Sequence, residues 1–179
     1  MAPLKRILND KEASDKYSET LGRIYRQSRR MKDMLNMVLD LRKMEVGKNS
    51  LKIESINFNK WLESSIEDII AEEHAEGIDI MLETDPAITE VDMDVRKCDT
   101  VLMNILINAI KHSAIGDTIT IKTRLSGKGS VIVSVSDQGP GLGDTDMSEL
   151  FTRFYQNSRE QYGSGIGLSY SKILIELMG

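Results

Sequence analysis

The sequence predicts an α+β fold: a two-layer α/β sandwich with helices on one face of a mixed sheet, preceded by an α-helical hairpin. Three observations favour it. From Ser18 to Val46 no proline interrupts a run of apolar residues at alternating steps of three and four, which is typical of a helical bundle. After this run, segments that alternate with period two are separated by segments with helical periodicity. The resulting order of helix, strands, helix, strands, helix favours a sandwich.

Composition excludes several classes of protein. The chain has 179 residues, of which 40% are hydrophobic and 28% charged, so it resembles neither a disordered nor a membrane-embedded protein. No apolar run approaches the ~18 residues that span a bilayer. The net charge of −5 argues against nucleic acid as the main partner, because phosphate-backbone binding needs a basic surface. Cys98 is the only cysteine, which excludes an intrachain disulfide, and we expect it to pack as a small hydrophobe.

The predicted hairpin precedes about residue 48. Residues 2–8 are typical of the end of a first helix, residues 9–17 of a loop, and residues 18–46 of a long second helix that Gly47 caps. Within the second helix, "RIYRQSRRMK" is either the solvated outer face of a bundle or a basic surface for an acidic partner.

The sandwich follows as an alternation of short elements. The helix over 57–77 should bury one apolar face, formed by Phe58, Trp61, Leu62, Ile66, Ile69 and Ile70. The expected elements are a strand over 51–56, a helix over 57–77, strands over 78–84 and 90–95, a helix from its N-cap Asp94 to about His112, strands over 118–125 and 130–137, and a helix over 166–178.

A polar stripe lies on the helix that starts at Asp94. Each helical residue advances about 100°, so Asn104, Asn108 and Lys111 fall on one narrow stripe of an otherwise apolar helix. The two amides could simply hydrogen-bond to a loop. They could also line a pocket in which amide oxygens ligate a hard cation beside phosphates, with the lysine as a point charge. The stripe alone leaves both open.

Two glycine-rich segments follow. In "DQGPGLGD", Asp137 ends an apolar strand, and Gly139, Gly141 and Gly143 allow positive φ and close approach of the backbone to a ligand. The carboxylate could accept a hydrogen bond from an exocyclic amine, although Asp, Gly and Pro also favour a plain turn. In "YGSGIGLS", glycines lead into the final helix, whose N-terminal N–H groups could bind a phosphate chain.

An Asn/Asn/Lys helix, a strand ending in D-x-G-x-G, the segment "LFTRFYQ" and a G-x-G-x-G helix start occur here in that order. The combination resembles the ATP-binding catalytic domain of sensor histidine kinases, in the superfamily shared with gyrase B subunits, large heat-shock chaperones and mismatch-repair ATPases. The resemblance covers essentially the whole chain, with a dimerisation hairpin at 1–48 and the ATP-binding domain at 49–179. The junction "LDLRKMEVGKNSLKIE" is similar to that of hybrid sensors, in which kinase and response regulator share one chain.

The resemblance implies roles for the stripe and for the adenine wall. Asn104 would contact Mg²⁺, while Asn108 and Lys111 would serve the phosphates of ATP. Asp137 would accept from the adenine amino group, and Gly139 and Gly141 would shape that wall. The segment from about Gly143 to Tyr162 would form a mobile lid anchored by Phe151 and Phe154. The other implied nucleotide-binding residues are His112, Arg153, Gly163, Gly165, Gly167 and Leu168.

The residue at position 104 distinguishes two reactions. In the chaperone, gyrase and mismatch-repair members, a glutamate at this position activates water. Asn104 cannot take a proton, so the resemblance implies phosphoryl transfer to a histidine on the dimerisation helix and relay to the receiver domain of a response regulator. The alternatives are an ATPase of the chaperone and gyrase type and a nucleotide-free dimer scaffold.

Neither histidine of the chain lies in the family's H-E-x-R-T-P motif, since one is His74 in the predicted helix over 57–77 and the other is His112. We therefore expect a fragment without its phosphoacceptor and without the last strands of the domain, which cannot phosphorylate itself. In its full-length context we expect a homodimer through the hairpin. We also expect it to be the cytoplasmic portion of an inner-membrane receptor, joined to the membrane only through segments upstream.

Overall fold

The computed structural model divides the chain into two units, Met1–Asn49 and Ser50–Gly179. It describes residues 20–22, 24, 25, 27, 28, 31, 32, 34–39, 42, 50–73, 75, 77–127, 129–143, 146–152, 155 and 165–179.

In the first unit, every described residue between positions 20 and 42 is helical, as the periodicity predicts. Large apolar side chains on this helix are exposed, among them Met31 at 64% and Leu35 at 62%. The predicted first arm at 2–8, the loop at 9–17 and the cap Gly47 lie outside the described residues. In the described part of the chain, no helix is both long and apolar enough to cross a membrane.

The second unit contains a three-stranded mixed sheet, as predicted. Its strands are β2 (Asp79–Glu83), β4 (Thr118–Leu125) and β5 (Val131–Ser136), in the order β2-β4-β5. Strands β2 and β4 are parallel, whereas β4 and β5 are antiparallel. A separate antiparallel pair joins β1 (Glu54–Asn57) to β3 (Glu90–Met93). Strand β1 starts three residues later than the alternation predicts, and the backbone N–H of Lys52 donates instead to the Asp94 carboxylate, at 2.9 Å.

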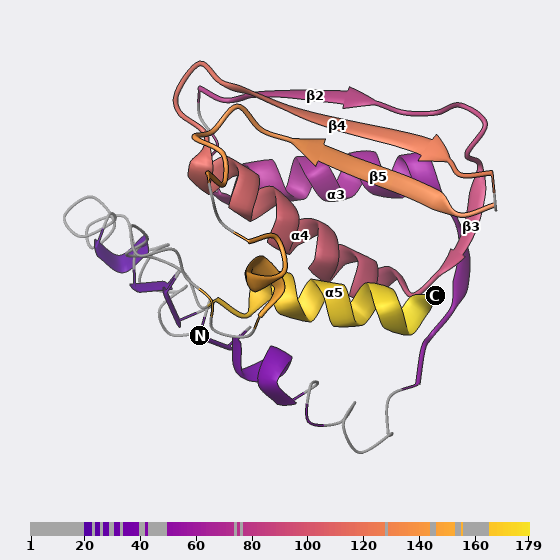
Figure 1. The fold of residues 1–179 in the computed structure, drawn as a ribbon, viewed down its shortest axis with the longest axis horizontal. Helices are drawn as coiled ribbons and strands as arrows, with labels where there is room; N and C mark the ends of the chain where they lie inside the picture. The colour runs from indigo at the N-terminus through magenta and orange to yellow at the C-terminus, as the bar shows by residue number, and fades with distance from the viewer. Residues whose placement is uncertain are drawn as a thin grey trace. The chain divides into compact units, whose positions relative to one another are not determined.

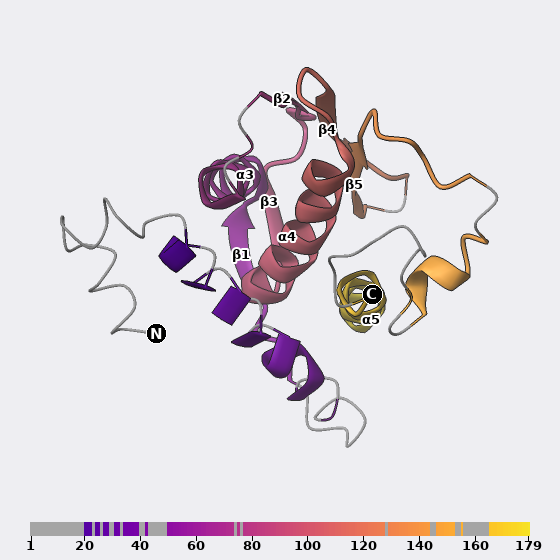
Figure 2. The same cartoon turned by 90° about the vertical axis from the view of Figure 1, so that its left-hand side faces the viewer.

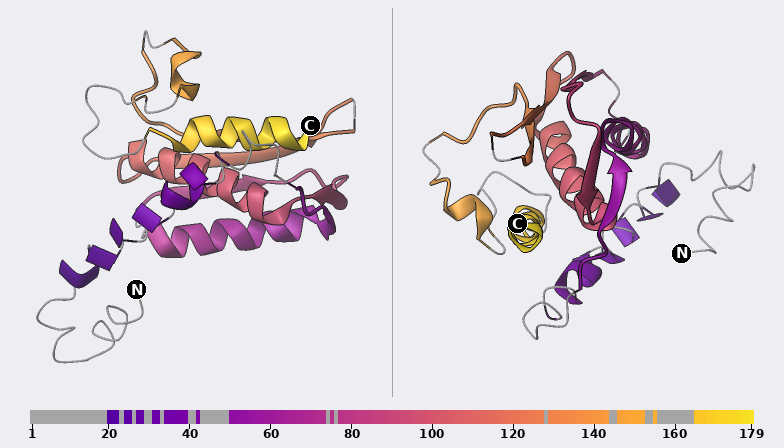
Figure 3. Two further views of the ribbon diagram at one scale, coloured as in Figure 1. Left: turned by 90° about the horizontal axis from the view of Figure 1, so that it is seen from below. Right: turned by 90° about the vertical axis from the view of Figure 1, so that its right-hand side faces the viewer.

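Three helices form the second layer. Helices α3 (Phe58–Glu73) and α4 (Val95–His112) cover one face of the sheet (Figure 1), and α4 lies between α3 and α5 (Gly167–Met178) (Figure 3). Helix α3 ends at Glu73, before the predicted end at residue 77, and the chain turns at Gly77, whose φ is +82°. The carbonyl of Gly77 accepts from the N–H of Gly116 at 2.6 Å, which ties this turn to the loop after α4.

The core lies between the sheet and this helical layer. Leu62 of α3, Leu106 of α4, and Ile119 and Ile121 of β4 are at most 1% exposed. The predicted apolar face of α3 is confirmed, since Phe58, Leu62 and Ile66 are buried and its other members pack against them. Burying a side chain of this size stabilises the fold by about 1.5–3 kcal/mol, so α4 is held rigidly under the sheet.

Polar contacts fix the start of α4. Asp94 is its N-cap, as predicted, and accepts from the backbone N–H of Lys97 at 3.2 Å. One turn later, the indole N–H of Trp61 donates to Asp99 at 2.7 Å and joins α3 to α4. The register of α4 relative to its neighbours is therefore set before the polar stripe begins.

Cys98 lies between these two aspartates, half-buried, with its Sγ 3.7 Å from Sδ of Met178 at the end of α5. Burial, followed by the negative charges of Asp94 and Asp99, raises the pKa of the Cys98 thiol from 9.0 to about 11. Since only the thiolate reacts, alkylation of the folded chain at pH 8 should be about a hundredfold slower than alkylation of the unfolded chain. Mass spectrometry with and without urea measures this ratio, and equal rates in the two states would contradict the burial seen here.

Candidate functional site

Helices α4 and α5 run antiparallel. Near its start, α5 contacts Asn104 through Gly167 and Ser171, and at its end Met178 contacts Cys98, one and a half turns earlier on α4. The N-terminus of α5 therefore faces the second half of α4, where the polar stripe continues. A helix N-terminus carries a partial positive charge and unpaired N–H groups, so this arrangement favours an anion beside the stripe.

Asn104 is half-buried at the start of the stripe. Its Nδ2 donates to the carbonyl of Gly167 at 3.3 Å and to Oγ of Ser171 at 3.1 Å. A Cβ on Gly167 would lie 3.3 Å from Oδ1 of Asn104, so glycine is what allows the helix start to approach this amide. The glycine expected to border phosphates thus has a second task, which is to make room for Asn104.

The rest of the stripe follows toward the end of α4. Asn108 and Lys111 lie one and two turns beyond Asn104, and both are exposed, while His112 ends the helix and is partly buried. From Asn104 to His112 the helix rises about 12 Å, at 1.5 Å per residue. The stripe therefore forms one long wall and not a single contact point.

The turn after β5 closes the far end of this wall. Asp137 directly follows β5, as predicted, and is exposed, with its Oδ1 accepting from the N–H of Gly139 at 2.9 Å. The neighbouring side chain, Gln138, accepts from the N–H of Thr118 at 2.7 Å, which ties the turn to the start of β4. Figure 2 shows this segment leaving β5 near the end of α4.

The three glycines of this turn, Gly139, Gly141 and Gly143, have different structural reasons for being glycine. Gly141 and Gly143 have φ values of +69° and +56°, as the sequence predicts. Gly139 does not have a positive φ; a Cβ there would lie 2.6 Å from the carbonyl oxygen of His112. Gly139 therefore does not use the positive φ that glycine allows, and close packing on α4 is the reason for a glycine at this position.

The structure describes part of the segment predicted as a lid. It contains the 3-10 helix η1 (Glu149–Phe151), where the sequence predicts only irregular chain. Gly165, with a φ of +64°, turns the chain into α5. Arg153, Phe154 and Gly163 lie outside the described residues, so their predicted roles stay predictions.

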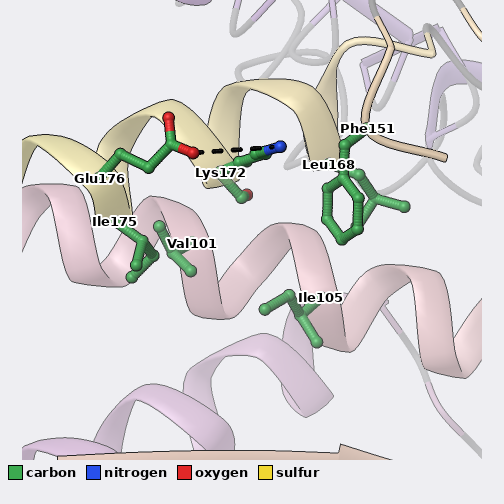
Figure 4. Close-up of a pocket in the computed structure, with 8 residues that line it drawn as sticks. Val101, Ile105, Phe151, Leu168, Lys172, Ile175 and Glu176 are labelled. Carbon is green, nitrogen blue, oxygen red and sulfur yellow. Dashed lines mark ion pairs between the residues drawn. The ribbon is translucent and has the colours of Figure 1, made fainter. Parts of the chain in front are cut away.

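A cavity of about 420 Å³ lies between α4, α5 and η1, to one side of the polar stripe. Figure 4 shows Leu168 there beside Phe151, and its predicted role at the nucleotide stays a prediction. Lys172 lies 5.7 Å from the centre of the Phe151 ring and 4.0 Å from Glu176. The cavity is lined by Val101, Ile105, Phe151, Leu168, Ser171, Lys172, Ile175 and Glu176.

The polar wall offers oxygen atoms of the kind that a magnesium ion bound to a nucleotide needs. Among the described residues, no three His, Cys, Asp or Glu side chains gather to hold a metal by themselves. Magnesium bound to nucleotide phosphates and water needs only one or two protein oxygens. The amide nitrogen of Asn104 donates to Gly167 and Ser171, and the amide oxygen, which lies beside Gly167 at the start of α5, is the atom that would hold such an ion.

Sequence reasoning did not identify Ser171. It lies one turn after Gly167 on α5, is 4% exposed, and contacts the side chain of Asn104. Its spacing of four residues from Gly167 places it on the same helix face, which was a usable signal. The contact itself joins residues 67 positions apart and therefore depends on how α4 and α5 pack.

Comparison with known proteins defines the class. Residues 93–179 match the family of histidine kinase-, DNA gyrase B- and HSP90-like ATPases. The relatives of the chain are, more narrowly, sensor and hybrid histidine kinases. Hybrid signal transduction histidine kinase B of Dictyostelium discoideum is 33% identical over 156 residues, which cover 82% of this chain and 8% of that protein. The chain spans between 8 and 28% of the length of three such relatives.

Solved structures agree on the fold. The catalytic domain of histidine kinase ThkA has a TM-score of 0.63 and 25% identity, over 72% of this chain and 82% of that one. Full-length ShkA, solved in complex with AMPPNP, has a TM-score of 0.72 over 89% of this chain and 33% of its own. At 20% identity, the likeness to ShkA concerns the fold alone. The predicted sandwich and the predicted kinase resemblance are both confirmed.

Proposed function

We propose that the chain binds ATP with Mg²⁺ along α4 and donates the γ-phosphoryl group to a histidine of a dimerisation helix, for relay to an aspartate of a response regulator. One observation carries this proposal: a single helix presents a continuous polar wall with an anion-favouring helix start at one end and an exposed carboxylate at the other. An elongated ligand with a phosphate chain and an amine-bearing base matches both ends.

The two ends assign the orientation of the nucleotide. The positive N-terminus of α5, which faces Asn104, favours the phosphates at that end of the wall. Lys111, two turns further along α4, would reach back along the wall as a second positive charge for them. Asp137, exposed beyond the end of α4, offers a carboxylate to the amino group of adenine. Asn104 would hold Mg²⁺ and Asn108 a phosphate oxygen, with His112, Gly139, Gly141, Gly165 and Gly167 shaping the walls.

Asn104 favours transfer over hydrolysis. Hydrolysis needs a base that takes a proton from water, whereas the amide of Asn104 directs its N–H groups to Gly167 and Ser171. An imidazole nitrogen can attack the γ-phosphorus without such a base. The new P–N bond forms as the bond from phosphorus to the β,γ-bridging oxygen breaks, and ADP leaves with that electron pair.

The first unit supports a dimer as the setting of this reaction. Ile24, Met31, Leu35, Val38 and Leu39 on its helix are each at least 45% exposed, and burying such a face against a second copy would remove apolar area from water. We propose that the receiver domain of a response regulator is the next partner. The membrane connection would lie in upstream segments of a receptor whose cytoplasmic part includes this chain.

The direct test is transfer of label in trans. This chain is mixed with γ-labelled ATP, Mg²⁺ and a longer form of the protein that includes the predicted phosphoacceptor histidine and carries Asp137→Asn. Label should appear on the longer form, disappear when its histidine is deleted, and stay absent from this chain incubated alone. Released phosphate without labelled protein would indicate an ATPase instead, and label on this chain alone would show that it contains a phosphoacceptor of its own, contrary to the proposal.

A further inference from the structure

We infer that Ser171 is a positioning residue that orients the amide of Asn104 so that its oxygen faces the magnesium ion of the nucleotide. The inference rests on the proposed function, because it assigns the geometry of the same site. The proposed function gives no role to Ser171.

The orientation of the Asn104 amide follows from its partners. A backbone carbonyl can only accept, so the group that faces Gly167 at 3.3 Å must be the amide nitrogen. The same nitrogen lies 3.1 Å from Oγ of Ser171, which serves as its second acceptor. Both contacts made by the amide nitrogen therefore go to α5, and they fix where Oδ1 lies, beside the start of α5 and 3.3 Å from the position of a Cβ on Gly167.

Ser171 is the shorter and better enclosed of the two contacts. It is 4% exposed, so water does not compete freely for its hydroxyl group. The carbonyl of Gly167 is the longer contact and belongs to the first turn of α5, next to the segment predicted as a lid. Partners that orient a metal ligand commonly change metal affinity by about 10- to 100-fold when they are removed.

Two variants of equal shape separate the effect of the hydroxyl group from the effect of side-chain size. Ser171→Thr keeps an acceptor, whereas Ser171→Val has the same branched shape without one. Ser171 is buried and borders the cavity of about 420 Å³, and the added methyl group is common to both variants, so they share any steric cost. Any cost of a β-branched residue in α5 is also shared by the two.

The quantity to measure is the magnesium coupling, defined as the Kd of a nonhydrolysable ATP analogue without Mg²⁺ divided by its Kd with saturating Mg²⁺. Ser171→Val should lower this ratio about tenfold, and Ser171→Thr should keep it near the wild-type value. In an Asn104→Ala background, Ser171→Val should lower it no further, because no amide is left to orient. Melting temperatures of the nucleotide-free variants measure any effect on folding separately.

Equal coupling in the threonine and valine variants, in a wild-type chain that does depend on Mg²⁺, would overturn the role of Ser171 alone. A wild-type chain that binds no nucleotide, or binds it with no dependence on Mg²⁺, would overturn the proposed function itself. A loss of melting temperature in Ser171→Val with unchanged coupling would show that the hydroxyl group serves only stability, and would also overturn the inference.

Discussion

Replacing Gly139 with alanine is expected to reduce both stability and nucleotide affinity. The new Cβ would lie 2.6 Å from the carbonyl oxygen of His112 and 2.9 Å from Oδ1 of Asp137. The first of these atoms belongs to the backbone of α4, whose end is fixed by packing under the sheet. The turn must therefore move away from α4, which should lower the free energy of unfolding by about 2 kcal/mol. Because Asp137 moves with the turn, affinity for ATP should fall at least about tenfold.

Gly127 supplies a matched control. It lies in the β4–β5 turn, has no positive φ, and a Cβ there would meet nothing within 4 Å. Gly127→Ala should change the free energy of unfolding by no more than about 0.5 kcal/mol. Urea denaturation compares the two variants. Equal stability of Gly139→Ala and Gly127→Ala would show that the turn does not pack on α4 as described.

Asp137→Asn should weaken ATP binding and remove the preference for the adenine amino group. The amide keeps the size of the carboxylate and can still accept from the N–H of Gly139, so the turn should be retained. One of its ends becomes a donor, which faces the donor hydrogens of the amine. Loss of a hydrogen bond to a charged group costs about 2 kcal/mol, which is roughly thirtyfold in Kd.

The informative readout is a ratio of affinities. Purine riboside triphosphate lacks the amino group, so the wild-type chain should prefer ATP to this analogue, whereas Asp137→Asn should bind both about equally. Asp146 provides a control, because it is also an exposed aspartate that accepts from the backbone N–H two residues on, at Ser148. Asp146→Asn should keep the preference. If Asp137→Asn keeps it too, the adenine wall lies elsewhere.

Local patterns were enough to predict most of the fold. Strand β4 has the predicted bounds, and α4 starts after its predicted N-cap and ends at His112, since alternation and a capping aspartate are properties of short segments. The structure differs from the prediction at the ends of two elements, where contacts with residues distant in the sequence decide the boundary. Strand β1 starts late where the N–H of Lys52 donates to Asp94, and α3 stops before Gly77, which bonds to the loop after α4.

The features of the candidate site also fall into those that local patterns predict and those that depend on distant contacts. The stripe on α4 and the position of Asp137 at a strand end follow from local periodicity. The reason for a glycine at position 139 and the contact between Asn104 and Ser171 do not, because each depends on elements that are distant in the sequence. The place of Leu168 in the cavity beside Phe151 likewise depends on how α4, α5 and η1 pack, which local patterns do not give.

The central claim is that the polar side of α4 binds a magnesium nucleotide. Calorimetric titration of the intact chain with a nonhydrolysable ATP analogue, with and without Mg²⁺, tests it most directly. The account predicts saturable binding that weakens when Mg²⁺ is removed and that Asn108→Ala reduces further. Heat of binding that is absent under both conditions, from a chain shown to be folded by its melting transition, would contradict it.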